Sequence, residues 1–201
     1  MTGRTGPGRD AGAPRSVAEP APSLGATRRP DTGRARERVA HAAPVAVRRA
    51  SVADLPTVVE LRLALLRENG DHPVYGQLRA DARDRAYEVF GAQLRSPHEV
   101  MFLAESEGEV VGILRCVDTL NSPLLQPERY CYVSSVYVRP RRRRIGVLKA
   151  LLGYAEGWCA ERGLTEIRLH NVPGGSASAA WTAEGFVVME EVRRKVLNER
   201  C

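Results

Sequence analysis

Stretches in which apolar and polar residues alternate, or in which apolar residues run together between turn residues, mark the strands of this chain. Such period-two patterns place every second side chain on one face of a sheet. The strongest is YCYVSSVYV, which is rich in Val and Tyr and is followed by Pro140. The predicted strands are Val45–Arg49, Val100–Ala104, Val110–Val117, Tyr130–Val138, Glu166–Asn171, and a final hairpin of Phe186–Met189 with Val192–Leu197.

Apolar residues at spacings of three and four predict helices between these strands. The first helix follows Ser51-x-x-Asp54, a usual N-terminal signal, and ends at Asn69-Gly70. The other predicted helices run from Leu78 to Leu94, from Gly146 to Arg162, and from Ser176 to Glu184. The resulting order, β-α-α-β-β-β-α-β-α-β-β, is typical of an α/β or α+β domain with a largely antiparallel sheet.

The first 44 residues lack this periodicity and differ in composition. They hold six of the 13 prolines, six of the 18 glycines, and eight arginines against four acidic residues. Such a segment cannot bury enough apolar surface to offset its chain entropy. We therefore expect residues 1–44 to be a disordered tail and residues 45–201 to form one folded domain. The tail has no apolar stretch of the length that a secretory signal needs.

Charge and cysteine content limit the class of protein further. The net charge is +6, of which +4 lies in residues 1–44, so the predicted domain carries only +2. A nearly neutral domain argues against specific nucleic-acid binding. No apolar run is long enough for a membrane span. The four cysteines form no CxxC pair, which predicts reduced thiols in a cytoplasmic protein and no metal site.

The sequence VRPRRRRIGVL, residues 138–148, lies between a strong predicted strand and a strong predicted helix. A turn there presents free backbone N–H groups at the positive end of a helix dipole, surrounded by arginines, and phosphate binds readily to such a site. Gly146 would let a phosphate approach the backbone closely. The alternative is a solvated basic turn without a ligand. Neither G-x-G-x-x-G nor G-x-x-x-x-G-K-[ST] is present, so the two common nucleotide-binding loops are not supported.

With its flanking elements, this segment resembles the acetyl-coenzyme A signature of the GNAT superfamily of N-acetyltransferases. In that signature an Arg or Gln, two residues, a Gly, one residue and a Gly or Ala form the loop that binds pyrophosphate. Arg143 and Gly146 match the first two positions. Leu148 departs from the small third residue, and Arg144 stands where Gly is frequent.

A second match lies further on, where Gly185-Phe186 follows a predicted short helix, as in the closing motif of the family. The element order also agrees, so the resemblance covers roughly residues 45–200. It implies an α/β (α+β) fold with a mixed, mostly antiparallel sheet of six to seven strands, a splayed central pair, and about four flanking helices. The splayed strands would be Tyr130–Val138 and Glu166–Asn171.

The resemblance also implies how acetyl-CoA would bind. The pantetheine arm would lie between the splayed strands and pair with backbone groups of Val136 and Val138, a form of strand addition. The pyrophosphate would accept hydrogen bonds from backbone N–H groups of the turn and of the first helical residues. The residues expected to bind the cofactor are Val136, Tyr137, Val138, Arg143, Arg144, Ile145, Gly146, Val147, Leu148, Lys149 and Asn171.

The implied reaction is direct attack of a neutral amine on the thioester. A backbone N–H of Val136 or Tyr137 would stabilise the oxyanion, and the Tyr137 ring, on the opposite face from Val136, is a candidate for lining the acceptor pocket. Trp181 stands where relatives often have an acidic Tyr; an indole N–H cannot give up a proton near neutral pH, so we interpret it as a wall residue. Ser134-Ser135 replaces a frequent Glu, which leaves His170 as a candidate base through water or as a structural imidazole.

We therefore expect an acetyl-CoA-dependent N-acetyltransferase acting on a primary amine of a small molecule or peptide in a ternary complex. The alternative is an acyl-CoA-binding module of the same fold with little turnover, because the customary Glu and Tyr are both replaced. Partners would be the amine acceptor and, as an open case, a second copy in a homodimer. A membrane or a specific nucleic acid is not expected. The loops Gly70–Gln77 and Asp118–Arg129, which would meet the acceptor, do not identify it.

Overall fold

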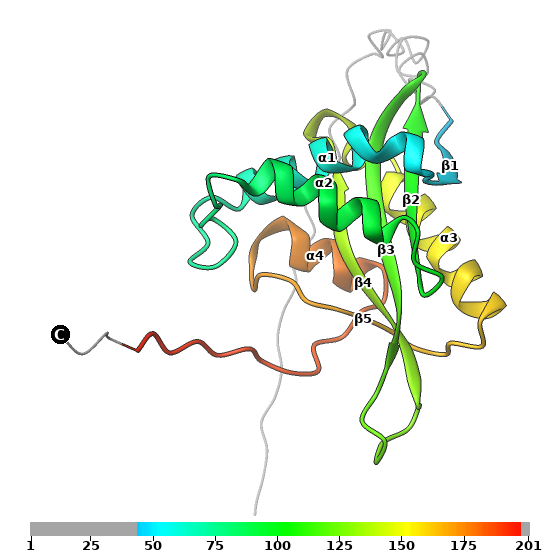
Figure 1. The fold of residues 1–201 in the computed structure, drawn as a ribbon. Helices are drawn as coiled ribbons and strands as arrows, with labels where there is room; N and C mark the ends of the chain where they lie inside the picture. The colour runs from blue at the N-terminus through cyan, green and yellow to red at the C-terminus, as the bar shows by residue number, and fades with distance from the viewer. Residues whose placement is uncertain (1–43, 198–201) are drawn as a thin grey trace, which may run out of the picture. The chain divides into compact units, whose positions relative to one another are not determined.

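Five strands in the order β1-β2-β3-β4-β5 form one sheet in the computed structural model, which describes residues 44–197 of the protein (Figure 1). Neighbouring strands from β1 to β4 are antiparallel, whereas β5 lies parallel to β4. The strands are β1 Ala46–Arg49, β2 Glu99–Ser106, β3 Glu109–Leu120, β4 Arg129–Val138 and β5 Ile167–Leu169. Each lies within or overlaps a strand predicted from the sequence, and β5 is the one that falls furthest short of its predicted length.

Helices cover both faces of this sheet. Figure 1 shows α1 and α2 in front of the sheet and α3 behind it, which agrees with the apolar side chains that each helix buries. The helices are α1 Leu55–Glu68, α2 Ala82–Gln93, α3 Val147–Glu161 and α4 Gly175–Ala183. Short 3-10 turns, η1 Val52–Asp54 and η2 Pro140–Arg142, precede α1 and α3.

Two apolar clusters, one on each face of the sheet, form the core. Met101 and Phe102 are neighbours in β2, yet Met101 packs under α1 and α2 whereas Phe102 packs against α3. Successive side chains of the central strands therefore enter the two clusters in turn, as expected for strands that are covered by helices on both sides. We call these the α1–α2 cluster and the α3 cluster. Leu61 and Leu151 are fully buried representatives of the two.

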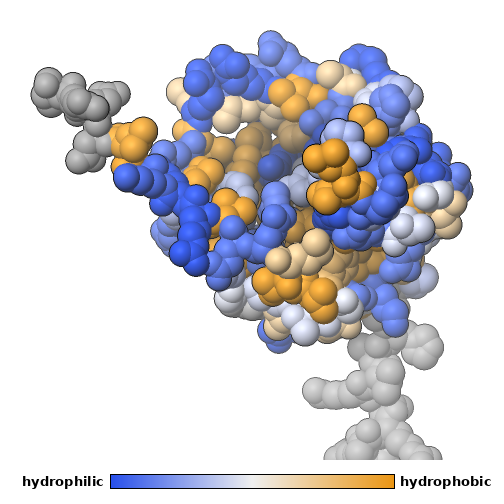
Figure 2. Space-filling model, turned by 90° about the horizontal axis from the view of Figure 1, so that it is seen from below, coloured by the Kyte–Doolittle hydropathy of each residue, from blue (hydrophilic) through white to orange (hydrophobic). Residues whose placement is uncertain are grey.

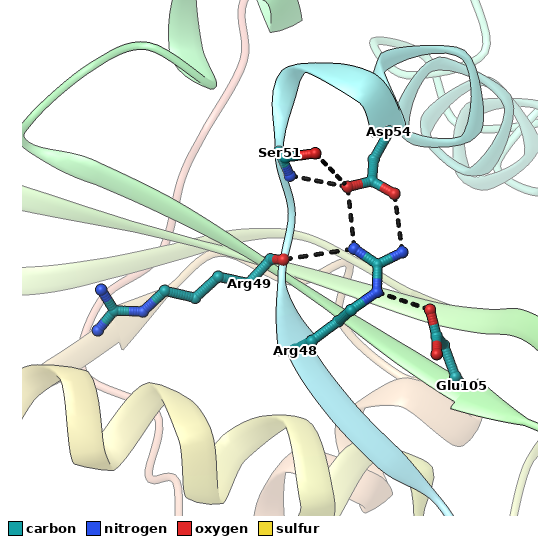
Figure 3. Close-up of polar contacts among 5 residues, drawn as sticks. All are labelled: Arg48, Arg49, Ser51, Asp54 and Glu105. Carbon is teal, nitrogen blue, oxygen red and sulfur yellow. Dashed lines mark hydrogen bonds and ion pairs between the residues drawn. The ribbon is translucent and has the colours of Figure 1, made fainter.

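A network of charged and polar side chains fixes the start of the first helix (Figure 3). The Asp54 carboxylate accepts hydrogen bonds from the Ser51 backbone N–H and hydroxyl, at 2.8 and 3.0 Å, and pairs with Arg48 at 2.8 Å. Arg48 also contacts Glu105 of β2 at 2.7 Å. The hydrogen bond from Arg48 lowers the pKa of Asp54 well below its ordinary value. This network joins β1, η1 and β2 at the predicted Ser51-x-x-Asp54 signal.

Three cysteines lie in the α3 cluster. Cys116, Cys131 and Cys159 are buried and free of disulfide bonds, and Cys201 lies outside the described residues. A hydrogen bond with Cys116 raises the pKa of the Cys131 thiol to about 12, so this thiol is protonated and unreactive near neutral pH. For these three residues, the prediction of buried, reduced thiols is confirmed.

The final hairpin predicted from Phe186–Met189 and Val192–Leu197 is not formed. Residues 186–197 contain no strand, so the sheet of the described residues has five strands and the predicted six to seven are not confirmed. A two-residue hairpin turn needs residues that adopt positive φ, and Glu190-Glu191 offers neither Gly nor Asn. From Val187 onward the apolar side chains of this segment are exposed instead; Val188 is 93% exposed.

Two further predictions concern the remainder of the chain. The disordered tail predicted for residues 1–44 falls on residues that, up to residue 43, lie outside the described part of the structure. Among the helices of residues 44–197, none combines the length and the apolar character needed to cross a bilayer.

Candidate functional site

The two strands β4 and β5 run side by side only at their beginnings. Cys131–Val133 of β4 pair with Ile167–Leu169, which is the whole of β5. Beyond this point β4 continues to Val138, and its other edge remains paired with β3. Among the described strands, the edge of β4 over residues 134–138 therefore has no partner on the β5 side. This geometry corresponds to the splayed pair expected from the sequence.

A β-bulge lies where this open edge begins. Ser135 has a φ of 55°, in the left-handed region, and Ser135 and Val136 together stand opposite the single residue Leu114 of β3. An extra residue of this kind leaves the regular hydrogen-bond ladder and re-aims the groups that follow it. The bulge therefore interrupts the pairing of β4 with β3 at the beginning of the open edge.

The bulge also shifts the alternation of β4. Val133 before the bulge and Val136 and Val138 after it all pack on the α3 cluster. In a regular strand, odd- and even-numbered residues would face opposite sides of the sheet. Tyr137 faces the α1–α2 cluster, opposite Val136 and Val138 as predicted, and is only 8% exposed. Its ring lies 5.7 Å from the guanidinium carbon of Arg143, within the core beneath α1. The Arg139 N–H donates to the Val111 carbonyl of β3, and N–H groups alternate sides along a strand, so the Tyr137 N–H also faces β3 whereas the Val138 N–H faces the open edge. Neither the ring nor the N–H of Tyr137 therefore lies at the open edge, in contrast to the prediction.

The turn after β4 presents a row of unpaired backbone N–H groups. Gly146 is the N-cap of α3 with a φ of 87°, and Arg144 also has a positive φ, of 64°. Within the described residues, the N–H groups of residues 144–149 have no hydrogen-bond acceptor, whereas the N–H of Ala150 donates to the Gly146 carbonyl at 3.0 Å. The N–H groups of a first helical turn have no partner in the helix, and left-handed residues before it create a concave anion-binding nest.

Three arginines of residues 138–148 are held by the protein itself, and the first of them, Arg139, pairs with Glu60 of α1 at 2.8 Å. Arg142 pairs with Glu107 in the turn between β2 and β3. Arg143 contacts both carboxylate oxygens of Glu68 at the end of α1, at 2.6 and 2.7 Å, and its Nε donates to the Val138 carbonyl at 2.9 Å. The hydrogen bond to Glu68 raises the pKa of Arg143. These side chains fasten the turn to its surroundings.

The other cations of the turn are available to a ligand. Arg141, Arg144 and Lys149 are exposed, and none has a carboxylate of the described residues within ion-pair distance. The backbone N–H of Arg143 approaches the Pro140 carbonyl at 3.4 Å, so the row of free donors begins at Arg144 rather than at Arg143. Six N–H donors and three cations are thus gathered at one helix start.

These groups fit a diphosphate, because N–H donors and cations are the groups that recognise phosphate oxygens. The side chain of Leu148 packs against the α3 cluster, so its departure from the family signature leaves the backbone N–H open. A Cβ added at Gly146 would meet no protein atom within 4 Å, which shows open space beside the N-cap. The donor set therefore suits the pyrophosphate of a coenzyme A ester.

Two predicted site residues directly follow β5. The Nδ1 atom of His170 lies 3.2 Å from the hydroxyl of Tyr132 on β4, and the two rings meet edge to face at 5.4 Å. Asn171 contacts the hydroxyl of Ser178 on α4 at 3.4 Å. The structure thus brings His170 next to the open edge of β4, while Asn171 links β5 to α4. Their roles stay predictions.

The remaining predicted residue, Trp181, comes from α4. Its ring packs edge to face on Phe186, with centroids 5.3 Å apart, and contacts the α3 cluster. The backbone N–H of Phe186 donates to the Trp181 carbonyl at 3.0 Å, which ends the helix at the predicted Gly185-Phe186 motif. This position agrees with the interpretation of Trp181 as a wall residue.

A polar cluster on the α1–α2 face was not predicted from the sequence. We call it the Arg62–Arg115 cluster. Hydrogen bonds join Glu99 of β2, Arg115 of β3 and Ser134 of β4, and Arg62 of α1 and Tyr132 of β4 lie near enough to Arg115 for their charges to interact. One signal for it was present, since Arg115 interrupts the apolar run of its strand on a covered face. Within residues 44–197, no group of three or more His, Cys, Asp and Glu side chains is arranged to hold a metal ion.

The open strand edge beside a helix start with free amides, in a fold of this element order, is the arrangement that the sequence resemblance implies. Residues 64–186 match the model of the Acetyltransferase (GNAT) family. The chain belongs to this family, and the resemblance found in its sequence is confirmed.

Among curated proteins, acetyl transferase GW6a from Oryza sativa subsp. japonica is 31% identical over 94 residues. The match takes in 42% of this chain and 22% of the rice protein, so the chain spans about a fifth of the relative that it matches.

Solved structures share the fold at lower identity. A predicted acetyltransferase from Clostridium acetobutylicum, solved with acetyl-CoA, has a TM-score of 0.63 and 19% identity, over 76% of this chain and 96% of that one. The aminoglycoside antibiotic 6′-N-acetyltransferase AAC(6')-Ih from Acinetobacter baumannii has a TM-score of 0.62 and 19% identity, over 78% and 99%. At these identities the likeness establishes the fold alone.

Proposed function

We propose that the protein transfers the acetyl group of acetyl-CoA to a primary amine of a small molecule or peptide within a ternary complex. The observation that carries this proposal is the row of six unpaired N–H groups at residues 144–149, placed beside the open edge of β4. When bound, acetyl-CoA supplies a thioester whose acyl carbon an amine nitrogen attacks, forming a C–N bond and releasing coenzyme A as the thiol.

The chain's own groups have separate tasks in this proposal. Residues 144–149 hold the diphosphate, and backbone groups of Val136 and Val138 pair with the pantetheine arm. The Val138 carbonyl already accepts the Arg143 Nε, and a carbonyl oxygen has a second lone pair for a further donor. The N–H of Val136, next to the bulge, stabilises the oxyanion that forms during attack.

The amine must lose a proton, and His170 is the candidate acceptor through water. The Nδ1 atom of His170 lies 3.2 Å from the Tyr132 hydroxyl, which can accept a hydrogen bond from an Nδ1–H group. In that tautomer the Nε2 atom carries the free lone pair that takes the proton, and Tyr132 fixes the orientation of the imidazole. Trp181 serves as an apolar wall, because an indole does not titrate near neutral pH.

Two measurements on the full chain test the proposal. Calorimetry with acetyl-CoA and with coenzyme A should give saturable binding with one site per chain. Thiol release should then follow when members of an amine panel are added. Binding without thiol release for every amine would favour the alternative, an acyl-CoA-binding module of the same fold, and absence of binding would refute the assigned site.

A further inference from the structure

The face of the sheet that carries α1 and α2 changes from apolar to polar along its strands. In β3, Ile113 belongs to the α1–α2 cluster, and Arg115 follows two residues later on the same face. In β2, Met101 belongs to that cluster, and Glu99 precedes it by two residues. The polar part leads toward the end of the sheet from which the β3–β4 connection projects (Figure 1). Seen from that end, the molecule is hollowed, with hydrophobic residues inside and hydrophilic residues around the rim (Figure 2).

One of the two arginines of this cluster is neutralised within the protein. Arg115 contacts Glu99 through Nε at 2.7 Å and through Nη2 at 2.6 Å, and both side chains are only about 15% exposed. The Nη1 atom of Arg115 donates to the Ser134 hydroxyl at 3.0 Å, in the residue that precedes the bulge. The Arg115–Glu99 pair thus carries no net charge and stands directly beside the open edge of β4.

The second arginine, Arg62, has no such compensation. It is half-buried, and no carboxylate of residues 44–197 lies within ion-pair distance of it. Burial lowers the pKa of Arg62, and the neighbouring Arg115 lowers it further, while Tyr75 and Tyr132 oppose this. A guanidinium remains charged near neutral pH even so. The cluster therefore holds one half-buried positive charge that has no counterion among residues 44–197 and whose guanidinium nitrogens reach solvent, an arrangement that leaves it free to bind an anion.

Nearby carboxylates are already engaged. Glu68, at the end of α1, is held by Arg143, and Asp118, further along β3 from Arg115, is held by Arg129 and Arg162. A polycation such as an aminoglycoside carries several ammonium groups that require carboxylate partners. These two carboxylates are therefore not free for such an acceptor, whereas Arg62 offers the opposite charge.

We infer that Arg62 binds a carboxylate of the acceptor, and that the acceptor is an amino-acid-like amine carrying a carboxylate rather than a polycation. This inference rests on the proposed acetyl transfer. A planar guanidinium matches a carboxylate through two parallel N–H donors. With its carboxylate at Arg62, the acceptor would have its amine toward the Ser134–Val136 bulge, where the acyl carbon is expected.

The test compares amino acids with their carboxamides, which keep the amine and lose the negative charge. Thiol release should show a kcat/KM about tenfold to a hundredfold higher for the carboxylate form of the best amino acid, because a site built for a charged group rejects the neutral analogue. Arg62→Gln should abolish this preference by lowering kcat/KM for the carboxylate form alone. Arg67→Gln, on the exposed end of the same helix, makes the same charge change and should keep the preference.

Binding measurements keep the inference testable without turnover. In protein saturated with coenzyme A, an N-acetyl amino acid should bind more tightly than its carboxamide, and Arg62→Gln should remove the difference while leaving the Kd for coenzyme A unchanged. Equal binding of the two forms, or a higher kcat/KM for a polyamine or an aminoglycoside, would overturn the inference. If the unaltered protein did not bind coenzyme A, the proposed function itself would be refuted instead. Thermal unfolding of Arg62→Gln should show little loss of stability, since Arg62 has no ion pair within residues 44–197.

Discussion

At the scale of single residues, backbone conformation determines the site more than side-chain identity does. Arg144 and Gly146 adopt positive φ, and together they leave the amides of residues 144–149 without partners. Leu148 departs from the family signature, yet its side chain packs inward and its N–H remains free. The turn therefore keeps its donors although two of its signature positions differ.

Gly146→Trp tests the role of this turn. Gly146 and Gly163 lie at opposite ends of α3, both have positive φ, and a Cβ at either would meet no protein atom within 4 Å. Trp at either position should therefore lower the free energy of unfolding by a similar amount, about 1–2 kcal/mol. Calorimetry should show coenzyme A binding abolished in Gly146→Trp and retained in Gly163→Trp. Equal affinities of the two variants would show that the turn does not bind coenzyme A.

The Asp54 carboxylate is expected to act on stability in a pH-dependent way. The hydrogen bond from Arg48 lowers the pKa of Asp54 in the folded protein, so its contribution is complete above the unfolded pKa of about 4 and is lost as the pH falls through the lower folded value. Asp54→Asn should lower the free energy of unfolding by about 1 kcal/mol near neutral pH, in line with the loss of a helix cap. Urea unfolding should show this difference shrinking in acid.

Asp71→Asn provides the matched control, because Asp71 is exposed in the loop between α1 and α2 and has no ion pair within the described residues. Its free energy of unfolding should stay near that of the unaltered protein at every pH. An Asp54→Asn deficit that persists unchanged in acid would show that the carboxylate charge is not responsible.

At the scale of elements, the open edge depends on a short strand and a bulge. β5 stops at Leu169, and the bulged Ser135 lies in the part of β4 that β5 does not reach. Ser135→Val should disturb this edge, because a β-branched residue is strongly disfavoured at positive φ. We expect the variant to lose about 1–2 kcal/mol of folding free energy and to bind acetyl-CoA more weakly.

Ser135→Gly is the companion variant, since glycine accepts positive φ without strain. It should retain the affinity for acetyl-CoA. Should Ser135→Val bind acetyl-CoA as tightly as Ser135→Gly, measured by calorimetry, the bulge would have no part in shaping the site.

Periodicity in the sequence predicts most of these elements, but not their long-range consequences. Ser51 and Asp54 predict the start of α1 from a four-residue motif. The turn around Gly146 is predictable for the same reason, because its signature lies within a few neighbouring residues. The bulge at Ser135 depends on pairing with β3, and two serines in a strand carry no mark of positive φ. Arg62 lies on α1, far along the chain from Arg115 and Tyr132, and only the fold brings these residues near enough for their charges to interact. Contacts between distant segments are not encoded in local pattern.

At the scale of the whole molecule, the core extends beyond the family match toward the N-terminus. Both apolar clusters are built from residues between Val45 and Phe186, and the GNAT model matches residues 64–186. We propose that the preceding residues make no contribution to this core. A chain beginning at Pro44 should therefore keep the thermal midpoint and acetyl-CoA affinity of the full chain, as measured by calorimetry. An unfolded product would contradict the proposed boundary.

The most direct measurement follows the backbone amides of residues 144–149 by 15N–1H NMR during addition of coenzyme A. The account predicts that these six signals shift more than those of the rest of the chain, and that pantetheine, which lacks the diphosphate, leaves them nearly unmoved while it shifts signals of Val136 and Val138. Unmoved signals of residues 144–149 at saturating coenzyme A, with the largest shifts elsewhere, would contradict the account.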